Sequence, residues 1–150
     1  MSIARYAFTS RVLAFLATTC SVAAVAWISG DITLLWVGAG GLAAGNIYMW
    51  RTGYAVSRVR TGVLLLLLVL LLAYLAQDIL LTWTADPLLL ARYLIYGLIV
   101  TSFDLRTWRN VLGTLLLAGM IFLLLSPMAF DFWFPVFAAG FVLLALAAAM

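Results

Sequence analysis

The chain has 150 residues, of which 68% are hydrophobic and only 9% are charged, and its formal net charge at pH 7 is +3. Soluble domains carry roughly 25% charged residues, so a water-soluble fold of this length could not cover so much apolar surface. The positive charge is spread over separate loops, which suits anionic lipid headgroups better than a nucleic acid. The chain has no histidine, which excludes imidazole ligation of zinc or haem and Ser-His or Cys-His catalysis.

The hydropathy pattern predicts an all-α, polytopic membrane protein, with residues 1–150 forming one domain of six transmembrane helices in antiparallel hairpins. A bilayer core about 30 Å thick needs roughly 20 apolar residues in a helix, and the apolar runs approach this length. Short gaps such as Gly30-Asp31 separate them. The expected helices cover residues 11–29, 32–50, 61–83, 87–103, 108–126 and 134–150.

The first apolar run imitates a secretory signal peptide, because it follows a basic start and ends in the small residues SVAAVA. The run continues through Trp27 and Ile28, however, which favours an uncleaved first helix. Its one cysteine, Cys20, cannot form an internal disulfide. We expect it to serve as a small apolar residue.

The arginines gather in alternate gaps between the apolar runs, and most aspartates occupy the other gaps. The arginine clusters are Arg5 with Arg11, Arg51 with Arg58 and Arg60, and Arg106 with Arg109; the aspartates opposite them are Asp31, Asp78, Asp86 and Asp131. Arginine-rich loops stay on the cytoplasmic side of a membrane. The pattern therefore predicts a multi-pass protein with both termini in the cytoplasm.

The second helix contains the small-residue stretch VGAGGLAAG. It matches a nucleotide-binding fingerprint at Gly38, Gly40 and Ala43, but the preceding strand and the later acidic residue that this motif requires are missing. Gly41 and Gly45 form GxxxG, and Gly38 lies one turn earlier, a pattern that predicts close helix packing. The partner is either another helix of this chain, which we favour, or a helix of another protein.

Asp78 and Arg92 are charged residues inside the third and fourth predicted helices, outside the arginine clusters. Asp78 is about one turn from the end of the third helix, and Arg92 is in the second turn of the fourth. Because an unpaired charge at membrane depth is costly, we predict an intramembrane ion pair between them. A proton or ion site is the alternative, although one acid and one base without histidine provide few groups for a relay.

The segment FDLRTWRN, with Asp104, Arg106 and Arg109, follows the fourth helix. Arginines here lie in the headgroup region, so these three residues are predicted to form a cytoplasmic anchor with Asp104 paired locally.

Residues 58–148 resemble the N-terminal membrane domain of TgpA-type transglutaminase-like proteins. In that family a helix ends in a glutamate that precedes an arginine-rich LRTRRD segment. Asp104 stands at the glutamate, Arg106 and Arg109 match, and Trp108 and Asn110 depart from an arginine and an aspartate. The resemblance implies a bacterial cytoplasmic (inner) membrane protein. It also implies a further helix and an extracytoplasmic Cys, His and Asp domain, which this sequence does not include. The final stretch VLLALAAAM lacks a polar tail, as expected of the membrane part of a longer protein.

The sequence offers no acid pair and no nucleophile beside a base, so we expect no enzyme activity and no catalytic or metal site. The expected function is a non-catalytic integral membrane module. It would anchor a transglutaminase-like protein or serve as an accessory or scaffold subunit of a larger complex, including the respiratory or photosynthetic type. Its partners would be membrane lipids and other membrane subunits, not nucleic acid, and no cofactor is expected. Two alternatives stay open: a small transporter or channel, and a subunit that contacts lipid, quinone or pigment.

Overall fold

The computed structural model describes residues 2–52, 58–82, 86–104, 108–128 and 132–150. These ranges are almost entirely helical and contain no strand, which confirms the all-α prediction. The elements are α1 (Ser2–Ser29), α2 (Ile32–Arg51), α3 (Arg58–Thr82), α4 (Pro87–Ser102), α5 (Trp108–Leu125), the 3-10 turn η1 (Ser126–Met128) and α6 (Trp133–Ala149).

The helix boundaries lie within a few residues of the predicted ones, except that α1 begins at Ser2 and not near residue 11. No glycine or proline interrupts the chain before Gly30, so the helix continues through the basic start. Gly30 ends α1 with φ 68°, a backbone conformation that glycine adopts without steric cost. Asp31 then caps α2 by accepting a hydrogen bond from the Thr33 N–H at 3.0 Å.

An aspartate side chain also caps the start of α4. The side chain of Asp86 accepts a hydrogen bond from the Leu88 N–H at 3.1 Å, and Pro87 occupies the first helical position. Proline suits this position because the first N–H of a helix has no partner within the helix. The aspartates that mark these two gaps in the sequence therefore also start the helices that follow them.

Four helical segments are long and apolar enough to cross a membrane: Phe8–Ser29, Ile32–Arg51, Arg58–Thr82 and Arg109–Met128. The fourth and sixth predicted spans are shorter, because α4 has 16 residues and α6 has 17. At 1.5 Å per residue these helices are about 24 and 26 Å long, slightly less than a bilayer core of about 30 Å. Both helices agree in length with the predicted ranges, 87–103 and 134–150, to within one residue.

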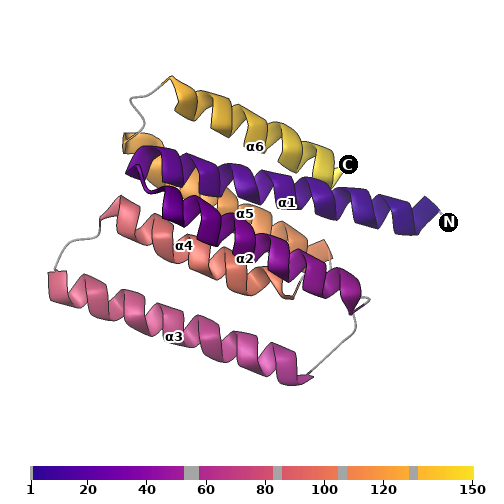
Figure 1. The fold of residues 1–150 in the computed structure, drawn as a ribbon, viewed down its shortest axis with the longest axis horizontal. Coiled ribbons are helices and arrows are strands. Elements are labelled where there is room, and N and C mark those ends of the chain that lie inside the picture. The colour runs from indigo at the N-terminus through magenta and orange to yellow at the C-terminus, as the bar shows by residue number, and fades with distance from the viewer. Residues whose placement is uncertain (1, 53–57, 83–85, 105–107, 129–131) are drawn as a thin grey trace.

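The helices lie side by side with their long axes roughly aligned (Figure 1). α1 packs against α2, α5 and α6, while α2 and α5 both pack against α4 (Figure 1). α3 lies at the edge of the bundle and packs mainly on α4. The helical bundle therefore has α1 and α4 near its middle and α3 at its periphery.

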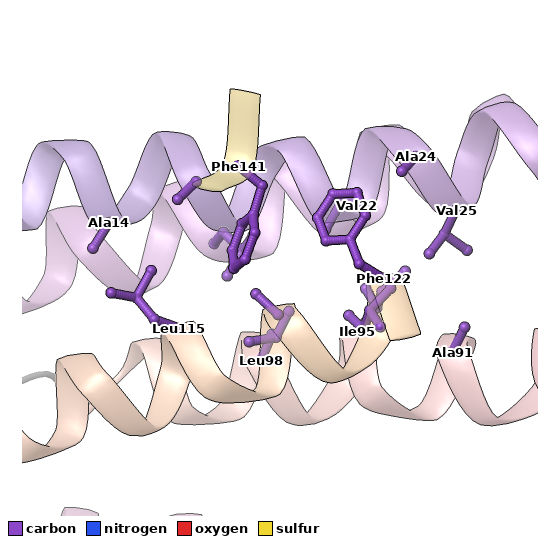
Figure 2. Close-up of a cluster of buried hydrophobic side chains, with 14 of the residues drawn as sticks. Ala14, Val22, Ala24, Val25, Ala91, Ile95, Leu98, Leu115, Phe122 and Phe141 are labelled. Atoms are coloured by element: carbon purple, nitrogen blue, oxygen red, sulfur yellow. The ribbon is translucent and has the colours of Figure 1, made fainter. Parts of the chain in front are cut away.

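The core combines small side chains of α1 with larger ones of its neighbours (Figure 2). Phe122 of α5 and Phe141 of α6 have ring centroids 5.0 Å apart and pack beside α1. The buried residues of α1 mostly recur every three or four positions and are Ala14, Ala17, Thr18, Ser21, Val22, Ala24, Val25 and Ala26. This spacing places small residues along one side of α1, where they allow neighbouring helices to approach closely.

α3 contributes no buried residue to this core. Its leucines and valines are exposed on several sides; Leu66, Val69 and Leu72, for example, are 60%, 61% and 62% exposed. An apolar helix that is exposed over most of its surface is typical of a segment in contact with lipid or with other membrane helices.

Candidate functional site

The three predicted packing glycines lie against helices of this chain. A Cβ on Gly38 would meet Val22 of α1 and lie 3.3 Å from Ile95 Cγ2 of α4. A Cβ on Gly41 would lie 2.8 Å from Ile99 Cγ2. A Cβ on Gly45 would overlap the Ser102 side chain and lie 3.0 Å from the Ser102 carbonyl carbon.

These contacts define a glycine seam, which we take as Gly38, Gly41 and Gly45 of α2 against Ile95, Ile99 and Ser102 of α4. The residues of α4 are spaced by four and three positions, so they share one side of that helix. The sequence left open whether these glycines pack against a helix of this chain or of another protein. In the structure they pack against helices of this chain. Gly40, which belongs to the same small-residue stretch, has nothing within 4 Å of an added Cβ.

Asp78 and Arg92 have different partners from the predicted ones. The hydroxyl of Tyr93 donates a hydrogen bond to Asp78 Oδ2. Arg92 Nη2 lies 3.8 Å from Asp31 Oδ2 at the start of α2, with both side chains partly exposed. Adjacent residues on a helix point about 100° apart, so α4 directs Tyr93 toward α3 and Arg92 toward α2. The predicted direct pair is thus replaced by two separate interactions.

The predicted cytoplasmic anchor is only partly within the described residues, because Arg106 lies outside them. Asp104, which was predicted to pair locally, has its Oδ1 3.9 Å from Nη2 of Arg60, at the start of α3. The Arg60 side chain is only 9% exposed. Its guanidinium also lies 5.9 Å from the ring centre of Tyr48 in α2. Arg60 therefore connects the start of α3 to α2 and to the end of α4.

Arg109 occupies the first turn of α5 and is exposed. The next residue, Asn110, donates a hydrogen bond from Nδ2 to the backbone carbonyl of Asp104 at 2.6 Å. This bond holds the start of α5 against the end of α4, which brings Arg109 to the same end of the bundle as the Arg60–Asp104 pair.

A cavity of about 300 Å³ lies between α3, α4 and α5 at this end. Polar groups and leucines both line it, so it can accept an amphiphilic molecule. Its lining residues are Thr61, Leu64, Leu65, Leu68, Val100, Thr101, Asp104, Arg109, Asn110, Gly113, Thr114 and Leu117. We call it the α3–α5 cavity.

Three of the residues that define these sites were missed by the sequence reasoning. Arg60 was counted only as part of a basic loop, and Tyr48 and Tyr93 were not singled out. A tyrosine one residue after Arg92 was the available signal for the Asp78 bond, because it can donate to a carboxylate without adding a charge. Nothing in the sequence indicated that Arg60 and Asp104 meet, since 43 residues lie between them.

Within the described ranges, no three His, Cys, Asp or Glu side chains come together as a metal site. Cys20 of α1 is a free, half-buried thiol. Comparisons of the chain with protein-family models, with curated proteins and with solved structures find no match.

Proposed function

We propose that this chain is a non-catalytic integral membrane module whose six helices cross the bacterial inner membrane as antiparallel hairpins, with both termini in the cytoplasm. The observation that carries the proposal is α3, which is apolar, exposed on several sides and without a buried residue. In water such a surface would associate non-specifically. Within a bilayer it is covered by lipid tails or by the helices of another membrane protein.

The distribution of arginine supports the orientation. The start of α1, the end of α2 and the starts of α3 and α5 lie at one end of the bundle, and these are the helix ends that carry the arginine clusters (Figure 1). The end of α6 lies at the same end (Figure 1). Since arginine-rich ends stay in the cytoplasm, this end is assigned to the cytoplasmic side.

The module acts through contact, as the anchor of a transglutaminase-like protein or as an accessory subunit of a membrane complex. The glycine seam is occupied within the chain, and α3, which has no buried residue, offers the most apolar surface to an outside partner. The TgpA-type resemblance favours the anchor role, and the isolated position of α3 suits either role.

A transporter or channel is less well supported, because the described core contains no charged side chain. Its buried polar residues are Thr18, Ser21, Ser102 and Thr114. Each of their hydroxyls donates to a backbone carbonyl three or four residues earlier in its own helix. Hydroxyls bonded in this way do not form a continuous polar path across the membrane. Lipid contact is the better second candidate, because of the α3–α5 cavity.

The test is spin-label accessibility on α3 in lipid vesicles, in a Cys20→Ala background. Single cysteines replace Val69, Leu70 and Leu72, which are 61%, 47% and 62% exposed and lie near the middle of the helix. We expect all three labels to be accessible to oxygen and protected from a water-soluble nickel complex. A label at Arg51, at the end of α2, should be accessible to nickel. Nickel access at the middle of α3 would exclude the membrane module.

A further inference from the structure

The α3–α5 cavity has one polar end and one apolar end. Thr61, Asp104 and Asn110 lie at or next to helix termini, whereas Leu68 and Leu117 lie deeper along α3 and α5. The seven positions between Thr61 and Leu68 correspond to about 10 Å along the helix axis. A ligand that fits therefore has a polar head at the arginine-rich end and an apolar part that extends toward the middle of the membrane.

The charge at the polar end favours an anion. Arg60 and Asp104 face one another at 3.9 Å and largely balance. Arg109, which lines the cavity, has no carboxylate within ion-pair distance among the described residues. Among the described residues, Arg60 beside the cavity and Asp104 and Arg109 in its lining together carry one net positive charge. Arg109 presents it as a guanidinium, a group that binds phosphate oxygens in a bidentate manner. An uncharged quinone would form no ion pair with this guanidinium.

The volume indicates how much of the ligand is enclosed. A cavity of about 300 Å³ is at the lower limit of small-molecule sites, so it holds a headgroup and the upper part of one chain. Leu65 lines the cavity and is 58% exposed on α3. It connects the enclosed part to the apolar outer surface of α3, where the rest of an acyl chain can lie.

From these observations we infer that the α3–α5 cavity binds an anionic phospholipid of the cytoplasmic leaflet. Its phosphate lies beside Arg109 and Asn110, and one acyl chain runs along Leu64, Leu68 and Leu117. Basic pockets between membrane helices on the cytoplasmic side bind anionic headgroups in this way. The inference rests on the proposed membrane embedding, but it adds a defined site and a defined lipid class.

The first test titrates the purified full chain in a neutral detergent with phosphatidylglycerol, phosphatidylcholine or inorganic phosphate, and follows the thermal unfolding midpoint by tryptophan fluorescence. A ligand that binds only the folded state raises this midpoint. Phosphatidylglycerol is expected to raise it, and the other two compounds are not. Equal effects of both lipids would show that the site does not distinguish the charge of the headgroup. An equal effect of inorganic phosphate would show an anion site that needs no acyl chain. Either result overturns the proposal.

The second test compares Arg109→Gln with Arg51→Gln. Arg51 also lies at the arginine-rich end, but it does not line the cavity. We expect Arg109→Gln to weaken phosphatidylglycerol binding by about tenfold, as for one lost charge-assisted hydrogen bond, and Arg51→Gln to leave it unchanged. Equal losses in both variants would indicate diffuse surface charge and would contradict a defined site.

A third variant covers the case in which Arg109→Gln fails to fold. Gly113 lines the cavity, and nothing lies within 4 Å of an added Cβ. Gly113→Leu should therefore project its side chain into the α3–α5 cavity, where the acyl chain is proposed to lie, and abolish the effect of phosphatidylglycerol. Gly140→Leu on α6, another glycine with open space around it, is the matched control and should retain the effect. A chain that passes the α3 spin-label test but shows no lipid selectivity would disprove this site alone and leave the membrane module intact.

Discussion

At the scale of single residues, the glycines of α2 differ in what surrounds them. Gly40 and Gly45 belong to the same short stretch of sequence, yet the first has open space around it and the second is pressed against Ser102. Gly38, Gly41 and Gly45, which the sequence singled out by their spacing, all lie close to other helices. The sequence could not tell which helix they face, because GxxxG describes one side of a contact only.

Gly45→Ala is expected to destabilise the protein by about 1–3 kcal/mol, the usual cost of overpacking. The added methyl group would overlap the Ser102 side chain and approach its carbonyl carbon to 3.0 Å, so the backbone of α2 or α4 must move. The measurement is the free energy of unfolding in mixed micelles.

Gly40→Ala is the matched control for this substitution. It should be neutral or stabilising by up to about 1 kcal/mol, because alanine favours a helix more than glycine does. If Gly45→Ala is as stable as Gly40→Ala, the glycine seam does not hold α2 against α4, and the packing described above is wrong at this position.

At the scale of the elements, α3 makes its polar contacts with the bundle near its two ends. Arg60 contacts Asp104 and Tyr48 near its start, and Asp78 accepts the Tyr93 hydrogen bond near its end. Between these points α3 packs on α4. A Cβ added to Gly97 of α4 would lie 3.9 Å from Cδ2 of Leu71 in α3. Polar contacts thus position a helix that shares little of the apolar core.

Tyr93→Phe tests the attachment at the end of α3. The substitution keeps the ring and removes the donor to Asp78, so a partly buried carboxylate loses its hydrogen bond. Measured hydrogen bonds between membrane helices are worth about 0.6 kcal/mol on average and up to about 1.7, and a loss in this range is expected in the free energy of unfolding.

Tyr96→Phe is the control for that experiment. The two tyrosine rings pack edge to face with centroids 6.2 Å apart, so both substitutions preserve this contact. Tyr96 is exposed, and no hydrogen bond of its hydroxyl occurs among the described residues. A change in stability for Tyr96→Phe equal to that for Tyr93→Phe would attribute the effect to the loss of any tyrosine hydroxyl and not to the bond with Asp78.

At the scale of the whole molecule, the topology can be tested by cysteine labelling in intact cells and in inside-out vesicles. In a Cys20→Ala background, Val56→Cys lies in an arginine-rich gap, and Ala85→Cys lies in an aspartate-containing gap. The positive-inside asymmetry predicts that an impermeant thiol reagent labels residue 85 from outside the cell and residue 56 only from the cytoplasmic side. Labelling of residue 56 in intact cells would invert the proposed orientation.

Composition and periodicity were sufficient for the helical class and for most helix ends, because these depend on local properties. Apolar runs set where a helix can lie in lipid, and Gly30, Asp31, Asp86 and Pro87 mark helix ends through their own backbone and capping preferences. The exception was the start of α1, where a basic stretch that contains no helix breaker continues the helix.

The tertiary structure decided the pairings. Each polar pairing depends on how its helices are rotated and on which helix lies beside which. The pairs are Asp78 with Tyr93, Arg92 with Asp31, and Arg60 with Asp104. A rotation of about 100° separates neighbouring residues on a helix, so predicting that two charges share a depth does not predict that they share a face. The same geometry leaves α3 at the edge and creates the α3–α5 cavity, since close packing around α1 and α4 arises from side-chain shapes that are matched only in three dimensions.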